Sequence, residues 1–142
     1  LLAIDATGQT AIHSGSNVLG NWGEAQGRDV AAGGNLLKTE QVPAAIVARF
    51  ESSIGHLGDR LLAAMHAGLE AGGEEGPVHS AGLLIVDKVA WPVAELRCDW
   101  TENCPITEIT TAWEIYKPQL DDYVRRALNP SEAPSYGVPG DS

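Results

Sequence analysis

Residues 79–100, HSAGLLIVDKVAWPVAELRCDW, decide the class of fold. Their apolar run from Ala81 to Val86 is far too short to cross a bilayer and has the length of one buried strand, which we expect over residues 79–87. Residues 94–100 alternate between apolar and polar side chains and predict a neighbouring strand. Pro92 belongs in the connection between them, because proline cannot donate to a β-ladder.

Two helices are predicted before this strand pair. The first starts near residue 39 or 40 and stops at Gly55, and the second runs from about residue 57 to the glycines at positions 72 and 73. In each helix an apolar residue recurs at every fourth position, which indicates one face packed in the core. These faces are Val42, Ile46, Phe50 and Ile54 in the first helix, and Leu57, Leu61, Met65 and Leu69 in the second.

The N-terminal part of the chain predicts strands and a long loop. Residues 1–5 indicate a buried strand, and residues 10–14 indicate the second arm of a hairpin that turns at Gly8. Residues 15–28 contain four glycines and predict a long irregular loop, a kind of segment that is often functional. Residues 29–32 predict a short strand that leads into Gly33-Gly34-Asn35. Since Leu1 opens inside an apolar run without a methionine, we expect upstream sequence that was cleaved, is disordered or is otherwise missing.

The C-terminal part predicts a third helix and a tail. The helix opens at Pro105 and carries apolar residues along one side, and Pro118 must kink it or start a new helix at Lys117. Residues 131–142 form a Pro/Gly-rich tail that is extended, disordered or wrapped around a neighbour. Helices grouped against mainly antiparallel strands give an α+β class. The apolar side consists of Ile106, Ile109, Trp113, Tyr116, Leu120, Val124 and Leu128.

Composition limits the class of protein. The chain has 142 residues, of which 44% are hydrophobic and 20% charged, so it has the composition of one folded domain rather than of a disordered segment. Its net charge of −10 argues against binding to nucleic acid or to an anionic membrane surface. No run is long and apolar enough to span a bilayer, and no secretory signal is visible, so we expect a cytoplasmic protein.

The two cysteines do not indicate a metal site. Cys98 and Cys104 lie six positions apart, so a disulfide is possible, but two reduced thiols are the expectation in a cytosolic protein. Their spacing does not match a zinc knuckle, and no pair of histidines at ligand spacing lies nearby. We expect no metal ion and no cofactor.

Gly33-Gly34-Asn35 is the best candidate for chemistry. Acyl transfer needs hydrogen-bond donors aimed at a developing oxyanion. Glycine lets a backbone N–H approach a ligand closely, and the side-chain amide of Asn35 adds a second donor. The same tripeptide is also compatible with a simple turn before the first helix.

Other polar residues have two interpretations each. His13 and Ser14 are neighbours on a predicted strand, so they point to opposite faces and do not form a catalytic pair. His79 and Ser80 open the strand over residues 79–87, and they either project into a site at the end of the sheet or form an edge pair that meets solvent. The tryptophans either line a pocket or pack in a core or an interface.

Several segments, in their order and spacing, resemble one family. They are LAIDATG at residues 2–8, the Asn-Trp-Gly of residues 21–23 followed by AGGNLL at 32–37, DRLLAA at 59–64 with Gly68 and the AGG of 71–73, and SAGLL at 80–84 with LRCD at 96–99. The family comprises bacterial and archaeal proteins of unknown function placed among the folds that resemble N-terminal nucleophile (Ntn) hydrolases, some of them labelled as major pilin proteins. The resemblance covers residues 1 to about 105, and the final helix and tail look like an extension.

This resemblance implies a four-layer αββα sandwich in which residues 1–130 are the C-terminal portion of one domain and residues 131–142 are a tail. It also implies hydrolysis of an amide bond by an N-terminal Thr, Ser or Cys, which an upstream segment would have to supply because Leu1 cannot play that role. By family position, Gly34 and Asn35 would lie near the cleft as oxyanion donors. Residues that would bind the substrate beside them are Trp22, His79, Ser80 and Asp99.

Two functions follow from this resemblance. The first is a hydrolase of a small amide or a related C–N bond, whose partner is a small-molecule substrate. The second is a non-catalytic binding or assembly module on the same fold, in which the tail and the tryptophans form the interface of a homodimer. A free N-terminal Thr, Ser or Cys on the intact protein would favour the first, and an oligomer that depends on residues 131–142 would favour the second.

Overall fold

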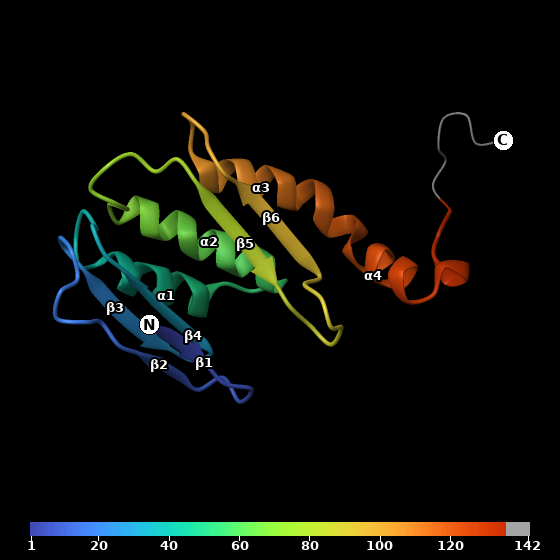
Figure 1. Cartoon of the computed structure of the whole chain (residues 1–142), viewed down its shortest axis with the longest axis horizontal. Coiled ribbons are helices and arrows are strands. Elements are labelled where there is room, and N and C mark those ends of the chain that lie inside the picture. The colour runs from blue at the N-terminus through green and yellow to red at the C-terminus, as the bar shows by residue number, and fades with distance from the viewer. Residues whose placement is uncertain (136–142) are drawn as a thin grey trace.

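The computed structural model describes residues 1–135, in which three antiparallel hairpins are combined with helices (Figure 1). The mixture of helices and small antiparallel sheets confirms the predicted α+β class. The strands are β1 (Leu2–Ile4), β2 (Thr10–Ile12), β3 (Gly23–Gly27), β4 (Val30–Gly34), β5 (Ala81–Ile85) and β6 (Ala94–Cys98). The helices are α1 (Val42–Ser52), α2 (Leu57–Glu70), α3 (Pro105–Tyr116) and α4 (Leu120–Leu128).

The β3–β4 hairpin is the middle of three layers in the N-terminal half. Val30 and Ala32 of β4 are buried in one cluster with Val47 and Phe50 of α1. The other face of this hairpin meets the β1–β2 hairpin, where Thr10 Oγ1 donates a hydrogen bond to Gln26 Oε1 at 3.0 Å. The layers therefore follow the order helix, β3–β4, β1–β2 (Figure 1).

The prediction of an irregular loop over residues 15–28 was wrong for its second half. Strand β3 lies there, paired with β4 from Gly23 opposite Gly34 to Gly27 opposite Val30. The segment contains no β-branched residue, so its sequence shows little preference for a strand. Its glycines are needed for packing, because a Cβ on Gly23 would lie 2.7 Å from the carbonyl oxygen of Glu40.

A second core lies between the β5–β6 hairpin and α3. Leu83 and Ile85 are buried in one cluster with Ile109 and Trp113, and Trp113 has no exposed surface. The opposite face of β5 is open, since its Leu84 is 55% exposed. The run from Ala81 to Val86 is therefore a strand buried on one face only, rather than the fully buried strand that we expected, because helices cover a single side of the hairpin.

Two other apolar positions are more exposed than predicted. Strand β1 exists, but its Leu2 and Ile4 are 49% and 59% exposed. Ile54 lies beyond the end of α1 at Ser52 and is almost fully exposed. Within residues 1–135, Leu2 and Ile4 are covered only in part and Ile54 hardly at all, although the sequence pattern itself is apolar.

Helix α2 buries a face beside the predicted one, and Leu61 of the predicted stripe packs against both cores. Its buried residues are Gly58, Leu62, Ala64 and Gly68, whereas Met65 of the predicted stripe is 44% exposed. Gly68 allows α1 to approach, because a Cβ at this position would lie 2.8 Å from Cγ1 of Ile46. This contact explains the glycine inside the helix. The four residues of the predicted stripe line hollows along α2.

Pro118 ends α3, as predicted. Lys117–Gln119 form a single 3₁₀ turn, and α4 begins at Leu120. Leu120 is buried and Val124 packs against the same core, but Leu128 is exposed. Pro130–Glu132 form another 3₁₀ turn, and the part of the predicted tail from residue 136 onward lies outside the described residues. Within residues 1–135, no helix has the length and apolar character needed to cross a membrane.

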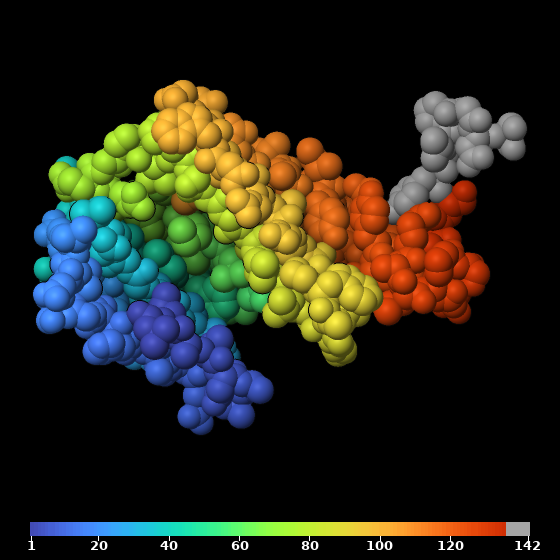
Figure 2. All heavy atoms as spheres, in the orientation of Figure 1, coloured from blue at the N-terminus to red at the C-terminus, as the bar shows by residue number. Residues whose placement is uncertain are grey.

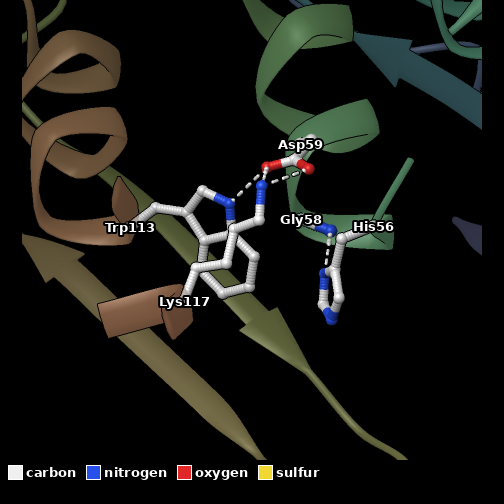
Figure 3. A network of polar contacts seen from close by, with 5 residues as sticks. All are labelled: His56, Gly58, Asp59, Trp113 and Lys117. Atoms are coloured by element: carbon white, nitrogen blue, oxygen red, sulfur yellow. Dashed lines mark hydrogen bonds and ion pairs between the residues drawn. The ribbon is translucent and has the colours of Figure 1, made fainter. Parts of the chain in front are cut away.

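A polar network joins the start of α2 to the end of α3 (Figure 3). Asp59 accepts hydrogen bonds from the indole N–H of Trp113 at 2.8 Å and from the ammonium group of Lys117 at 2.7 Å. His56 caps α2 because its Nδ1 accepts a hydrogen bond from the backbone N–H of Gly58 at 3.1 Å. Burial alone would raise the pKa of Asp59, but the donors from Lys117 and Trp113 outweigh it and hold the pKa below its ordinary value of 3.8.

The replacement Asp59→Asn should flatten the acid side of the stability profile. A carboxylate whose pKa is lower in the folded state contributes stability that is complete above the unfolded pKa, and that is lost as the pH falls through the folded pKa. We therefore expect the free energy of unfolding to fall more steeply below about pH 5 in the wild type than in the variant. Urea unfolding at stepped pH measures this, with the exposed Asp121→Asn as the control. Identical slopes for wild type and Asp59→Asn would contradict the prediction.

Candidate functional site

Residues 33–36, which we call the Asn35 corner, lead the chain from β4 towards α1. Gly33 and Gly34 are the last residues of β4, where Gly34 lies opposite Gly23, so they are strand residues rather than part of a turn. All four residues of the corner are exposed. A ligand can therefore reach both the glycine backbone and the side chain of Asn35.

The backbone of the corner is held in a strained conformation. Leu36 has a φ of 54°, in the left-handed region that a bulky side chain rarely adopts. Its N–H donates to the carbonyl oxygen of Leu19 at 3.2 Å, and the N–H of Leu37 donates to that of Asn21 at 2.9 Å. Gly20 makes this approach possible, because a Cβ there would lie 3.3 Å from Cα of Leu36. Strain of this kind gathers at functional sites.

The side-chain amide of Asn35 is only weakly engaged within the protein. Its Nδ2 donates to the carbonyl oxygen of Leu19 at 3.5 Å, which is at the long limit for a hydrogen bond. A bond of this length is easily exchanged for a shorter one to a ligand oxygen. The corner thus presents an exposed amide donor on a fixed backbone.

Two hollows meet at the Asn35 corner. One, of about 240 Å³, lies beside the β1–β2 hairpin and is also lined by His13 and Ser14. The other, of about 230 Å³, lies beside α2 and is also lined by Met65 and Glu74. Gly33, Gly34 and Asn35 line both hollows. The corner therefore separates two spaces of different character, one bounded by strands and one by a helix.

Ser14 is tied to a carboxylate. Its Oγ donates a hydrogen bond to Glu24 Oε2 at 2.7 Å, which links the segment after β2 to β3. The strand that we predicted over residues 10–14 ends at Ile12, so His13 and Ser14 lie just beyond it. The hydroxyl of Ser14 thus joins the two hairpins by a hydrogen bond. Both residues line the hollow beside the β1–β2 hairpin, and that they do not form a catalytic pair stays a prediction.

His79 and Asp99 lie at the open end of the β5–β6 hairpin, where each contacts near neighbours. The ring of His79 stacks on Trp100 with centroids 4.1 Å apart and planes inclined by 8°. Its Nδ1 lies 2.8 Å from the carbonyl oxygen of Thr101 and must carry the proton, because a carbonyl only accepts. Asp99 pairs with Arg97 at 2.6 Å on the surface.

Ser80 and Asn35 are connected by neighbouring hollows. A hollow of about 370 Å³ between α2, β5 and α3 is lined by Ser80, and it shares Met65 and Glu74 with the α2-side hollow at the corner. Trp22, His79 and Asp99 line neither of these two hollows. The structure therefore brings Ser80 onto the same side of the molecule as Asn35. Trp22 lies in the segment that runs beside the corner, between Asn21, which accepts a hydrogen bond from Leu37, and Gly23, which lies opposite Gly34.

Glu74 was missed by the sequence analysis. It lies in the turn after α2 and pairs with Leu37 in an isolated antiparallel bridge, which holds it beside the Asn35 corner. Among residues 1–135 it is the acidic side chain that lines both the Ser80 hollow and the α2-side hollow. A glutamate after two glycines has no distinguishing pattern, so only the contact with Leu37 reveals its position.

The fold and the corner define an α+β protein with a glycine-rich candidate site. A protein-family model matches residues 1–109, and its description is a family of unknown function, DUF1028. The chain belongs to the DUF1028 family. The matched span agrees with the expected resemblance over residues 1 to about 105, and it ends inside α3. No curated protein matches the sequence.

A solved structure is similar to this chain. It is the crystal structure of a protein from Silicibacter pomeroyi that is also assigned to DUF1028. The two sequences are 27% identical and the structures superpose with a TM-score of 0.76. The match covers 88% of this chain and 55% of the Silicibacter chain, so this chain spans little more than half the length of its solved relative.

Proposed function

We propose that this chain is part of a hydrolase of the N-terminal nucleophile type that acts on a small amide or a related C–N bond. In this proposal residues 1–130 are the C-terminal portion of a four-layer αββα sandwich. The order helix, β3–β4, β1–β2 supports it, because these are three successive layers of such a sandwich. The length of the Silicibacter relative also supports it, since a longer chain has room for a segment that carries the nucleophile.

The Asn35 corner is the observation that carries the proposal. An oxyanion hole needs donors that are fixed before the reaction, because their reorganisation would otherwise raise the barrier. The strained Leu36 and its hydrogen bond to Leu19 fix the backbone beside Asn35. The corner is exposed and faces a hollow beside the β1–β2 hairpin that is large enough for a small amide substrate.

The proposed reaction assigns one role to each group. The hydroxyl or thiol of an N-terminal Thr, Ser or Cys outside these residues would attack the amide carbon, and its own α-amine would take the proton. The tetrahedral oxyanion would accept hydrogen bonds from the Asn35 amide and the Gly34 N–H. Collapse of this intermediate would break the C–N bond, return the proton to the leaving amine and leave an acyl-enzyme, which water would then hydrolyse.

The intact mass and N-terminal sequence of the purified full-length protein test this proposal. We expect a mature N-terminal Thr, Ser or Cys. We also expect hydrolysis of some members of a panel of small amides, measured as the release of ammonia or amine. Replacing that N-terminal residue by Ala should abolish the release. A different N-terminal residue combined with no hydrolysis across the panel would contradict the proposal.

A further inference from the structure

Three hollows lie end to end along one face of α2. The first, of about 330 Å³, is lined by Leu57 and Leu61. The second, of about 370 Å³, is lined by Leu61 and Met65, and the third, of about 230 Å³, by Met65 and Leu69. Because each hollow shares a residue with the next, these four side chains form the floor of one continuous groove, which we call the α2 trough.

Two strands with one open edge each form the walls of the α2 trough. Within residues 1–135, β4 pairs only with β3 and β5 only with β6. Val30 and Ala31 of β4 line the first hollow, Gly33 and Gly34 line the third, and all of β5 except Ile85 lines the second. In Figure 1 the two hairpins lie on either side of α2, and Figure 2 shows green atoms recessed between the blue and yellow segments.

An open strand edge beside apolar side chains favours the addition of another strand. Unpaired N–H and C=O groups are a template for pairing, and proteins normally cover or pair them. Met65 and Leu57 on the floor are 44% and 42% exposed, although helix residues with this apolar pattern normally pack in a core. One added strand would therefore satisfy two backbone edges and bury the stripe of α2 in a single step.

The two edges match in length. β4 and β5 contain five residues each, which corresponds to about 17 Å of extended chain. One extended segment of about five residues can therefore pair with both. Its side chains would alternate between the two faces of the sheet, so those that point towards α2 would be apolar.

We propose that the α2 trough holds an extended segment from the remainder of the same polypeptide, which forms a strand between β4 and β5 and joins the two hairpins into one sheet. The Silicibacter relative indicates the source of this segment, because 45% of its length has no counterpart in this chain; this share is 100% minus the 55% that is covered. The segment explains why the predicted apolar face of α2 is exposed in residues 1–135.

The third hollow ends at Gly34 and Asn35, so one end of the added strand lies beside the Asn35 corner. In this respect the inference rests on the proposed function, because it gives the nucleophile-bearing segment a path to the oxyanion donors. The presence of the strand itself does not depend on any chemistry. Protection of backbone amides from exchange tests for the added strand, and hydrolysis of amide substrates tests for the proposed reaction. Each proposal can therefore fail without the other.

Native-state hydrogen exchange on the full-length protein tests the inference without any mutation. In an antiparallel pair, successive residues point their N–H groups to opposite sides, so a strand with one open edge shows alternating slow and fast exchange. We expect consecutive amides to exchange slowly over residues 30–33 of β4 and over β5, because each strand has a partner on both sides. The amide of Gly34, the proposed oxyanion donor at the end of β4, is left out of the comparison. Alternating exchange in either strand would overturn the inference, even if the protein hydrolyses amides.

Thiol labelling gives a second measurement. Met65→Cys on the floor of the α2 trough is compared with Ile115→Cys, which is 67% exposed on α3. In the native full-length protein, we expect the thiol of Met65→Cys to be labelled about 100-fold or more slowly than that of Ile115→Cys, because it is reached only through local opening. In urea, where the protein is unfolded, the two thiols should be labelled at equal rates. Mass spectrometry of the labelled peptides separates these sites from Cys98 and Cys104. Equal labelling rates of the two thiols in the native protein would overturn the inference. Protection of Met65→Cys that is lost when the protein is diluted would assign the α2 trough to a second copy of the chain and would also overturn it.

Discussion

The replacement Asn35→Ala in the full-length protein is expected to lower kcat for amide hydrolysis by about 10²–10³-fold, the effect typical of removing one oxyanion-hole donor. The Asn35 amide would interact with the oxyanion more strongly than with the ground-state carbonyl, so the loss should appear in kcat rather than in KM. The side chain is exposed, and its hydrogen bond to Leu19 is long, so we expect the melting temperature to change little.

The control for this experiment is Asn17→Ala, which removes an exposed asparagine in the neighbouring loop that lines neither hollow at the corner. It should leave both kcat and the melting temperature unchanged. Single-turnover kinetics on the amide that the wild type hydrolyses best would separate the acylation step from product release. An Asn35→Ala variant with wild-type kcat would remove the assigned role of Asn35.

The replacement Trp113→Ala is expected to destabilise the protein by about 3–5 kcal/mol, a large part of the stability of a typical domain. Trp113 is completely buried between α3 and the β5–β6 hairpin, so its removal leaves a cavity that rigid neighbours fill only in part. Asp59 also loses the hydrogen bond from the indole N–H. Urea denaturation monitored by circular dichroism would measure the change in the free energy of unfolding.

Trp100→Ala is the matched control, because Trp100 is 69% exposed and makes its ring contact with His79 at the surface. We expect a loss of no more than about 1 kcal/mol there. Trp113→Phe separates the two parts of the effect, since it keeps most of the ring volume and removes the N–H donor. Equal losses for Trp113→Ala and Trp100→Ala would contradict the position of Trp113 in the core.

Several elements could be predicted because their signals are local. Pro118 interrupts a helix wherever it occurs, since it lacks an N–H and clashes with the preceding turn, and the structure changes from α3 to α4 at that point. Ile109 and Trp113 recur at helical spacing beside strands that follow a period of two, so the second core was visible in the pattern. The identity of Gly33-Gly34-Asn35 as a candidate also came from residue chemistry alone.

Other features depend on partners that a local pattern does not name. β3 has a weak strand sequence and forms because β4 and α1 accept its glycine backbone at close range. The strained φ of Leu36 follows from hydrogen bonds to a loop about 16 residues earlier in the chain. Glu74 reaches the corner through its bridge with Leu37. None of these contacts leaves a periodic signal.

The order of residues alone therefore predicted the α+β class and the main helices and strands, because propensity, periodicity and proline act over a few neighbouring residues. The role of Gly34 and Asn35 as donors stays a prediction from residue chemistry. Folding in three dimensions decided which face of α2 is covered, where β3 pairs, and which candidate side chains share a hollow. The physical reason is that burial and pairing require two surfaces, and the local sequence describes only one of them. Helix α2 is an example: its apolar stripe is evident in the sequence, but α1 covers Gly68 and the core covers Leu62.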